Sequence, residues 1–269
     1  MRTILASVLA AVILATAAPA QSFGRGRFSG EVSVEIVSDQ GSAYLAVPHK
    51  DFQKGLTRVT KKYLEAKRGE NYGIVIRNTT PERVGVVVAV DGRNIISGKS
   101  SELGNAEDMY IIEGYGLARY DGWRTDKDTV HRFYFTEPAD SYSVRTFADT
   151  SAMGVIAVAI YREKDRPKPL KERKRRGPAA PAPSLEGDSQ GKSKALMDKS
   201  AGTGFGNSQY SPTVQVAFEP ESIPMLKTLL KYEWRETLCR KGLLSCGKET
   251  GNRLWDPDGY APYPPGYHE

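Results

Sequence analysis

The sequence predicts a mainly β protein, an antiparallel β-sandwich that is followed, after a disordered linker, by a C-terminal strand and an amphipathic helix. Three observations predict this fold. Apolar and polar residues alternate with a period of two over much of residues 27–162. Glycine, asparagine and aspartate separate these short runs, as turns separate strands. A segment of low hydrophobicity, residues 163–201, then interrupts the chain.

The first 20 residues have the pattern of a secretory signal peptide. One arginine precedes an apolar run, residues 4–18, that is too short to span a bilayer comfortably. Ala18-Pro19-Ala20 then offers the small residues that a signal peptidase needs. We therefore expect an exported chain, periplasmic or secreted, that begins at Gln21 and does not span a membrane after cleavage. A membrane anchor that is retained is the alternative.

Strands are expected where the alternation is clearest. Val32, Val34 and Ile36 alternate with polar residues, which is typical of a strand with one wet face. Residues 84–90 are apolar on both faces, which indicates a central strand, and Asp91-Gly92 directly after them is a strong hairpin signal. The other expected strands are residues 72–76, 94–97, 109–112, 117–120, 130–136 and 154–161.

The basic residues are concentrated in one place. Residues 162–176 contain nine basic and three acidic side chains, and this local excess equals the formal charge of +6 of the whole chain. Composition therefore does not imply a basic face on the folded part. Residues 163–201 contain no aromatic residue and no Val, Ile or Thr, so they cannot bury enough apolar surface to offset the entropy of ordering. We expect a disordered basic, Pro-rich linker.

Residues 202–247 are expected to form a strand, residues 212–218, and a helix, residues 222–241. Ser222 can cap the first turn, Pro224 is tolerated there, and Gly242 is placed to end the helix. The apolar stripe of this helix consists of Leu226, Leu230, Trp234 and Leu238. One strand and one helix cannot form a core, so the stripe must dock on the sandwich, on a partner or on a second copy. Residues 248–269 are expected to be a loose tail rich in Pro, Gly and Tyr.

The two cysteines, Cys239 and Cys246, predict a disulfide. In an oxidising compartment, a neighbouring pair of this kind forms a bridge that contributes about 2–3 kcal/mol. A metal site is the rival interpretation, but two thiols without a nearby histidine or a second cysteine pair supply only half a ligand set. We expect no metal.

Several blocks resemble a family of exported bacterial proteins of uncharacterised function. The blocks are YGIVIRNTT at residues 72–80, the run 84–98 that contains DGRNIISG, GWR at 122–124, HRF at 131–133, GVIAVA at 154–159, GTGFG at 202–206 and YEWRE at 232–236. The resemblance covers most of the chain apart from the signal and the linker. It implies a periplasmic or secreted β protein and carries no catalytic residues.

The residues usual in enzymes are poorly placed. His268 lies in the tail, His49 lies in a loop-like stretch, and His131 shares a strand face with phenylalanines, which is typical of a core histidine. Ser189 and Lys192 have an S-x-x-K spacing, but they lie in the linker, where nothing can desolvate the lysine. We therefore expect no enzyme activity, no catalytic residues and no cofactor.

Two motifs suggest ligands and are better explained by structure. Gly202, Gly204 and Gly206 have the composition of a phosphate loop, but no strand closely precedes them and no helix follows. Asp121, Asp126 and Asp128 crowd one stretch, but their spacing lacks the glycine and the glutamate of a calcium loop. Solvated turn aspartates are the simpler interpretation.

The binding residues that the sequence offers are aromatic or basic. Tyr115, Tyr120 and Trp123 flank one loop and can form a platform for a sugar or a peptide, although such residues are more often part of a sandwich core. A disordered cationic run binds polyanions by releasing counterions. The residues of that run are Arg173, Lys174, Arg175 and Arg176.

Together these features predict an exported, non-enzymatic binding or structural protein of the bacterial cell envelope, with an unknown protein or envelope component as its partner. One alternative is polyanion binding, to lipopolysaccharide or nucleic acid, through the basic linker. A second alternative is a hydrolase with carboxylate catalysis, because carboxylates from distant loops can meet in space.

Overall fold

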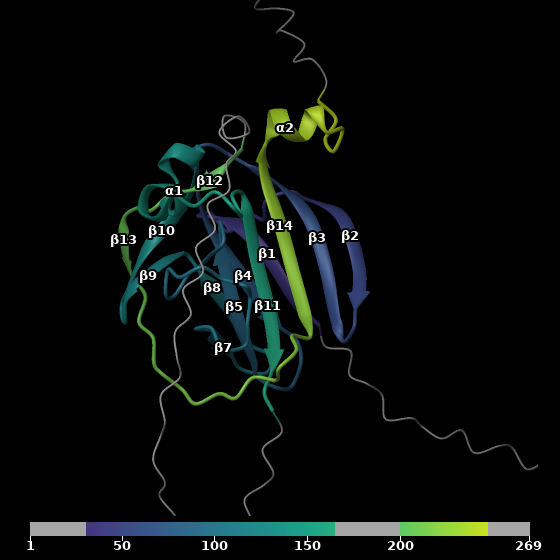
Figure 1. The fold of residues 1–269 in the computed structure, drawn as a ribbon, viewed down its shortest axis with the longest axis vertical. Helices are drawn as coiled ribbons and strands as arrows, with labels where there is room; N and C mark the ends of the chain where they lie inside the picture. Colours follow the sequence, from purple (N-terminus) through teal and green to yellow (C-terminus); the bar gives the residue numbers. More distant parts are fainter. Residues whose placement is uncertain (1–30, 165–199, 247–269) are drawn as a thin grey trace, which may run out of the picture.

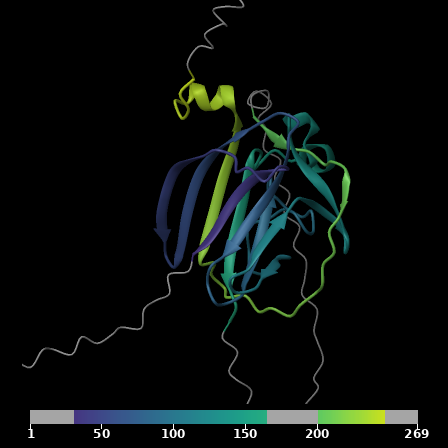
Figure 2. The same ribbon diagram turned by 180° about the vertical axis from the view of Figure 1, so that it is seen from behind.

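Two β-sheets pack face to face in the computed structural model, which describes residues 31–164 and 200–246 (Figures 1 and 2). The mainly β sandwich that the sequence predicts is confirmed. The expected signal peptide and tail, and residues 165–199 of the expected linker, lie outside the described residues.

The first sheet has the order β1-β4-β10-β12. Its strands are β1 (Val32–Ser38), β4 (Asn71–Asn78), β8 (Leu117–Tyr120), β9 (Gly122–Asp126), β10 (Thr129–Thr136), β12 (Gly202–Thr203) and β13 (Ser208–Tyr210). In addition to this order, β8 pairs with β4, while β9 and β13 pair with β10. Consequently β1 lies at one border of the sheet, with β4 as its only partner among these strands.

The second sheet has the order β2-β3-β14-β11-β5-β6. Its strands are β2 (Ala46–Lys54), β3 (Thr57–Ala66), β5 (Val84–Val90), β6 (Arg93–Asn94), β7 (Tyr110–Ile112), β11 (Val155–Arg162) and β14 (Leu226–Trp234). β7 pairs with β5, and β14 is parallel to β3 and antiparallel to β11. Every other pair in this sheet is antiparallel.

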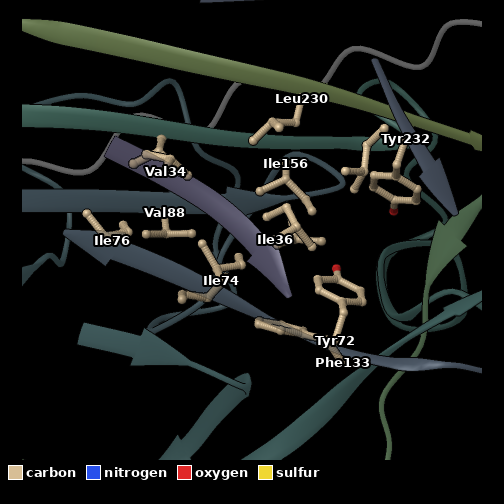
Figure 3. Close-up of a cluster of buried hydrophobic side chains, with 14 of the residues drawn as sticks. Val34, Ile36, Tyr72, Ile74, Ile76, Val88, Phe133, Ile156, Leu230 and Tyr232 are labelled. Carbon is tan, nitrogen blue, oxygen red and sulfur yellow. The ribbon is translucent and has the colours of Figure 1, made fainter. Parts of the chain in front are cut away.

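The core lies between the two sheets, where alternate side chains of each strand point inward (Figure 3). Ile36, Ile74 and Phe133 come from the first sheet, and Ile156 and Leu230 come from the second. All five are at most 2% exposed. Burial of apolar surface stabilises a fold by about 25 cal/mol per Å², so this cluster is the main hydrophobic core of the sandwich.

β5 is central, as its sequence predicts, and all seven of its residues are buried. Its second apolar face packs with that of β11 in a smaller cluster on the outside of the sheet. Leu103, from the segment between β6 and β7, packs on this cluster, and Tyr161 donates a hydrogen bond of 2.5 Å to the carbonyl of Leu103. Both apolar faces of β5 are therefore covered by packed side chains.

The prediction of a long C-terminal helix is wrong for most of its length. Residues 222–225 are not helical, β14 takes residues 226–234, and only α2 (Arg235–Arg240) is helical. The spacing of four that suggests a helix also fits a period of two, and the side chains of Thr228 and Tyr232 fill the intermediate buried positions. The stripe does dock on the sandwich, as a strand between β3 and β11.

Residues 212–218, expected as a strand, form no strand in the structure. They belong to an extended stretch between β13 and β14, in which the side chain of Val214 is 82% exposed. The expected return strand at residues 94–97 is shorter, since β6 ends at Asn94. The described helices are η1 (Pro138–Asp140), α1 (Tyr142–Phe147) and α2. None of the helices in residues 31–164 and 200–246 could span a membrane.

Candidate functional site

A groove of about 500 Å³ lies between the border strand β1 and the β2–β3 hairpin. Residues 31–35 form one wall and residues of β2 and β3 form the other, and Leu226 and Thr228 of β14 also line it. The groove exists because the second sheet extends further than the first at this border: β2 and β3 continue past β14, whereas the first sheet ends at β1. The hairpin surface that faces the groove consequently lacks a covering strand.

The border of β1 is only half closed. Near its end, the N–H of Tyr44 donates to the carbonyl of Ile36, and the N–H of Ser38 donates to the carbonyl of Ser42. Alternate residues of a strand direct their backbone groups to the same side. The N–H and C=O groups of Val34 therefore point away from β4 as those of Ile36 do, and no strand in the described part of the chain pairs with them.

An arginine joins the two walls of the groove. Arg58 of β3 donates to Glu31 at 2.5 Å and to both carboxylate oxygens of Asp51, at 2.6 and 3.1 Å. The hydrogen bonds from Arg58 lower the pKa of Asp51. Lys62, which also lines the groove, forms no ion pair among the described residues. The groove therefore presents strand backbone, three lysines (Lys50, Lys61 and Lys62) and an arginine that is paired with two carboxylates.

A second hollow, of about 460 Å³, lies at the other end of β1 and carries three carboxylates. Glu65 is bound by Arg235 at 2.9 Å, and Glu70 accepts a hydrogen bond of 2.8 Å from Tyr44. Partial burial raises the pKa of Asp39, but hydrogen bonds from Asn71 and Arg132 and the nearby arginine charges outweigh this and lower it. A carboxylate hydrolase needs a general acid that is protonated near neutral pH. The lowered pKa of Asp39 makes this side chain a poor general acid.

The predicted aromatic platform is not assembled as one surface. Trp123 is 2% exposed and donates from Nε1 to the carbonyl of Gly204 at 3.0 Å, so it belongs to the core. Tyr120 stacks on Tyr110 with ring centroids 4.3 Å apart. Tyr115 is 70% exposed and lies in a turn, with φ of 59°. Of these three residues, only Tyr115 is positioned for a ligand from solution.

The glycines of residues 202–206 are explained by close packing. A Cβ atom on Gly204 would lie 2.1 Å from the Tyr134 ring, and one on Gly206 would lie 2.9 Å from the carbonyl of Arg132. The side chain of Phe205 covers His131, with ring centroids 4.1 Å apart. The segment therefore lies flat against β10.

Gly204→Ala is expected to lower the free energy of unfolding by about 1–3 kcal/mol, because the added methyl group forces the Tyr134 ring or the backbone to move. Urea denaturation followed by circular dichroism measures this. Gly104→Ala is the matched control, because its Cβ would meet only a side-chain oxygen of Glu107 at 3.7 Å. The control should change stability by less than about 0.5 kcal/mol; equal losses in both variants would contradict the packing explanation.

A buried polar network closes one end of the core. Asp91, in the turn after β5, accepts hydrogen bonds from the N–H of Gly154 at 2.7 Å, the N–H of Thr203 at 2.8 Å and the hydroxyl of Tyr232 at 2.5 Å. The Thr203 hydroxyl also lies 2.8 Å from that of Tyr72. Burial raises the pKa of Asp91 to about 6, although these hydrogen bonds lower it. Asp91 is 1% exposed, so the network joins the two sheets and is closed to substrates.

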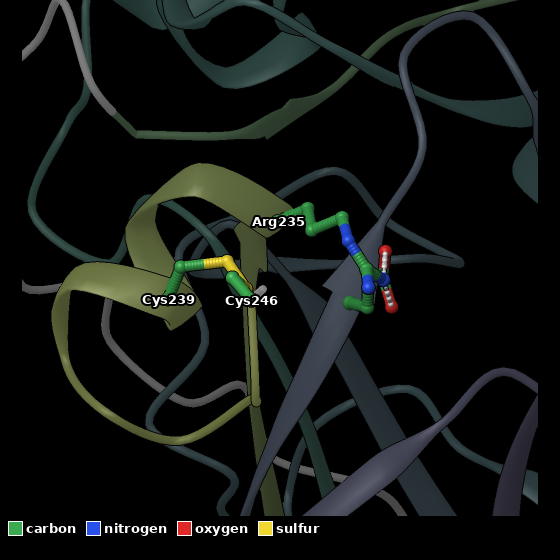
Figure 4. Close-up of a disulfide and its surroundings, with 4 residues drawn as sticks. Arg235, Cys239 and Cys246 are labelled. Carbon is green, nitrogen blue, oxygen red and sulfur yellow. Dashed lines mark hydrogen bonds and ion pairs between the residues drawn. A yellow bond between two sulfur atoms is a disulfide. The ribbon is translucent and has the colours of Figure 1, made fainter. Parts of the chain in front are cut away.

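The disulfide between Cys239 and Cys246 is confirmed (Figure 4). It joins α2 to the segment that follows, with Cα atoms 5.6 Å apart.

Asp121, Asp126 and Asp128 do not gather, and no group of three potential metal ligands occurs within residues 31–164 and 200–246. Residues 173–176, the predicted polyanion site, lie outside the described residues, so that site stays a prediction.

Sequence reasoning missed the groove because it missed both strands of the β2–β3 hairpin and placed His49 in a loop, whereas His49 lies in β2. The signal that could have found the hairpin is Gly55-Leu56, a two-residue turn that begins with glycine and is followed by Thr57 and Val59, residues of high β-propensity. Comparison with protein-family models, with curated proteins and with solved structures found no match to this chain.

Proposed function

We propose that this chain is an exported, non-enzymatic binding protein of the bacterial cell envelope, and that it binds an extended segment of a partner protein along β1. The observation that carries this proposal is the open border of β1 beside the 500 Å³ groove. Export rests on the pattern of residues 1–20. The Cys239–Cys246 bridge supports it, because disulfides persist in oxidising compartments.

Strand addition suits this groove for two reasons. First, unpaired backbone groups on a border strand are a template for another strand, and the main-chain hydrogen bonds supply affinity. Second, a strand added beside β1 would extend the first sheet beneath the hairpin. It would cover groove-lining residues such as Thr60 and Lys62, which are half-buried in the structure. The first sheet would then extend beneath the hairpin, which at present continues past the edge of that sheet.

The test uses a photo-crosslinking residue at Ser33, which is exposed and lines the groove. In the native envelope, adducts are expected from Ser33 at both low and high salt, because main-chain hydrogen bonds are not screened as surface charges are. The same crosslinker at the exposed Tyr115 should give none. Adducts from Tyr115 alone would favour the aromatic surface and contradict the proposal.

Matched variants at Val34 isolate the backbone contribution. The N–H of Val34 points away from β4, so Val34→Pro keeps the β1–β4 ladder while it removes a donor from the groove. Val34→Ala loses buried side-chain surface but keeps that N–H. We expect Val34→Pro to abolish the Ser33 adducts and Val34→Ala to retain them, with circular dichroism confirming that both fold. Equal adduct yields from the two variants would refute strand addition.

A further inference from the structure

The outer face of the β2–β3 hairpin is cationic. Cross-strand partners point to the same side of a sheet, and the register pairs Lys50 with Lys61, Phe52 with Val59 and Lys54 with Thr57. Lys227 of β14 lies beside Val59 in the parallel pair and so shares this face. We call Lys50, Lys54, Lys61 and Lys227, together with Phe52, the lysine face.

The charges of the lysine face are not neutralised. Lys50 and Lys61 are direct cross-strand partners, and like charges in this position destabilise a sheet. Within residues 31–164 and 200–246, none of the four lysines forms an ion pair, and the carboxylates further along the outer face already have partners. Glu65 is bound by Arg235, and Glu233 is bound by Lys241. Repulsion between these lysines therefore lowers the stability of the folded protein, and an anionic partner would relieve it.

Apolar side chains are exposed at the same hairpin. Gly55, with φ of 60°, and Leu56 form its two-residue turn, and the side chain of Leu56 is 77% exposed. Phe52, between the lysines, is 41% exposed. Exposed apolar groups at a tip with flanking lysines are typical of surfaces that insert into the boundary between lipid headgroups and acyl chains.

We propose that the lysine face and the tip at Leu56 bind the surface of an anionic phospholipid bilayer. The lysines would contact lipid phosphates, and Phe52 and Leu56 would enter the headgroup boundary. A soluble polyanion would use the charges alone, whereas a bilayer uses the apolar side chains too. This activity goes beyond the partner binding proposed above. Lys50 and Lys61 also line the groove, but strand addition depends on the backbone of β1 whereas vesicle binding depends on the lysines and Leu56, so the two can fail separately.

The experiment measures sedimentation of the chain from residue 21 to residue 269 with phosphatidylglycerol vesicles and with phosphatidylcholine vesicles. Binding is expected for phosphatidylglycerol only. At about 1 kcal/mol per lysine near such a surface, the triple variant Lys50→Gln, Lys54→Gln, Lys61→Gln should bind about a hundredfold more weakly. Leu56→Ser should weaken vesicle binding several-fold and leave binding to heparin unchanged.

The control with the same charge change is Lys67→Gln, Lys99→Gln, Lys127→Gln, at exposed lysines outside the lysine face. It should bind vesicles as the parent chain does. A further background carries glutamine at all four basic positions of residues 173–176, which removes any contribution of that run. In this background, the lysine-face triple variant should still bind vesicles more weakly than the control triple variant. Equal loss in both triple variants, or a Leu56→Ser chain that binds vesicles normally, would overturn the proposal. Val34→Pro should leave vesicle binding unaltered.

Discussion

Leu230→Pro is expected to unfold the protein. Leu230 is 1% exposed and lies in the middle of β14, which pairs with β3 on one side and β11 on the other. The substitution removes a backbone donor from a central strand, which costs about 1–3 kcal/mol. It also truncates a buried leucine, which costs about 2–5 kcal/mol. Together these losses approach the roughly 5–15 kcal/mol that stabilise a typical domain.

Urea denaturation followed by tryptophan fluorescence measures this loss, since Trp123 and Trp234 are both buried. Val214→Pro is the control, because Val214 is 82% exposed and lies outside the sheets. Its stability should change by less than about 0.5 kcal/mol. A Val214→Pro chain less stable than Leu230→Pro would mean that the strand occupies residues 212–218, as the sequence alone suggests.

The free energy of unfolding is expected to fall by about 2 kcal/mol between pH 4 and pH 6 because of Asp91. Burial raises the pKa of this carboxyl to about 6 in the folded protein, whereas an aspartate in an unfolded chain titrates near about 4. Between these values the folded state binds more protons. The stabilisation is therefore complete below pH 4 and is lost as the pH rises through the folded pKa.

Asp91→Asn should flatten this part of the pH profile, because its side chain does not titrate. Asparagine also tolerates the positive φ of 49° at this position. It should be destabilised at pH 4, since its NH₂ group cannot accept the hydrogen bond from Thr203. Urea denaturation at a series of pH values measures both effects.

Asp149→Asn serves as the contrast. Partial burial raises the pKa of Asp149, but hydrogen bonds from Ser151 and the Arg93 charge outweigh it and lower that pKa. Its contribution to stability is thus present above the unfolded pKa and is lost as the pH falls. Asp149→Asn should keep the decline between pH 4 and pH 6. A parent chain whose stability rises across this window would show that Asp91 is not the dominant titrating group there.

Sequence pattern was sufficient wherever a strand buries its alternate residues in the chain's own core. β1 and β4 bury alternate residues, and β5 and β11, which are apolar on both faces, bury nearly every residue, as expected. The pattern failed for β2, whose residues are mostly exposed on both faces, since a strand without a buried face has no period of burial. It also failed for β14, where apolar residues four positions apart satisfy a helix and a strand equally.

The candidate site was hidden for a related reason. A groove beside a border strand is produced by unequal widths of two sheets, which only the tertiary pairing determines. The lysine face was hidden because the composition outside residues 162–176 is neutral overall. Residues 46–66 nevertheless contain five basic and two acidic side chains. The register then separates the paired Arg58 from Lys50, Lys54 and Lys61 on the opposite face.

The position of β14 has a consequence for the order in which the protein is assembled. Contacts at the start of this strand join residues that are 167 positions apart, such as Thr57 and Pro224. The ribosome therefore releases β3 and β11 well before their shared neighbour exists, and the nascent chain has an unfilled place in the middle of a sheet. The export that we propose would benefit from this delay, since the first 160 or so residues cannot close into a finished fold before the last segment follows.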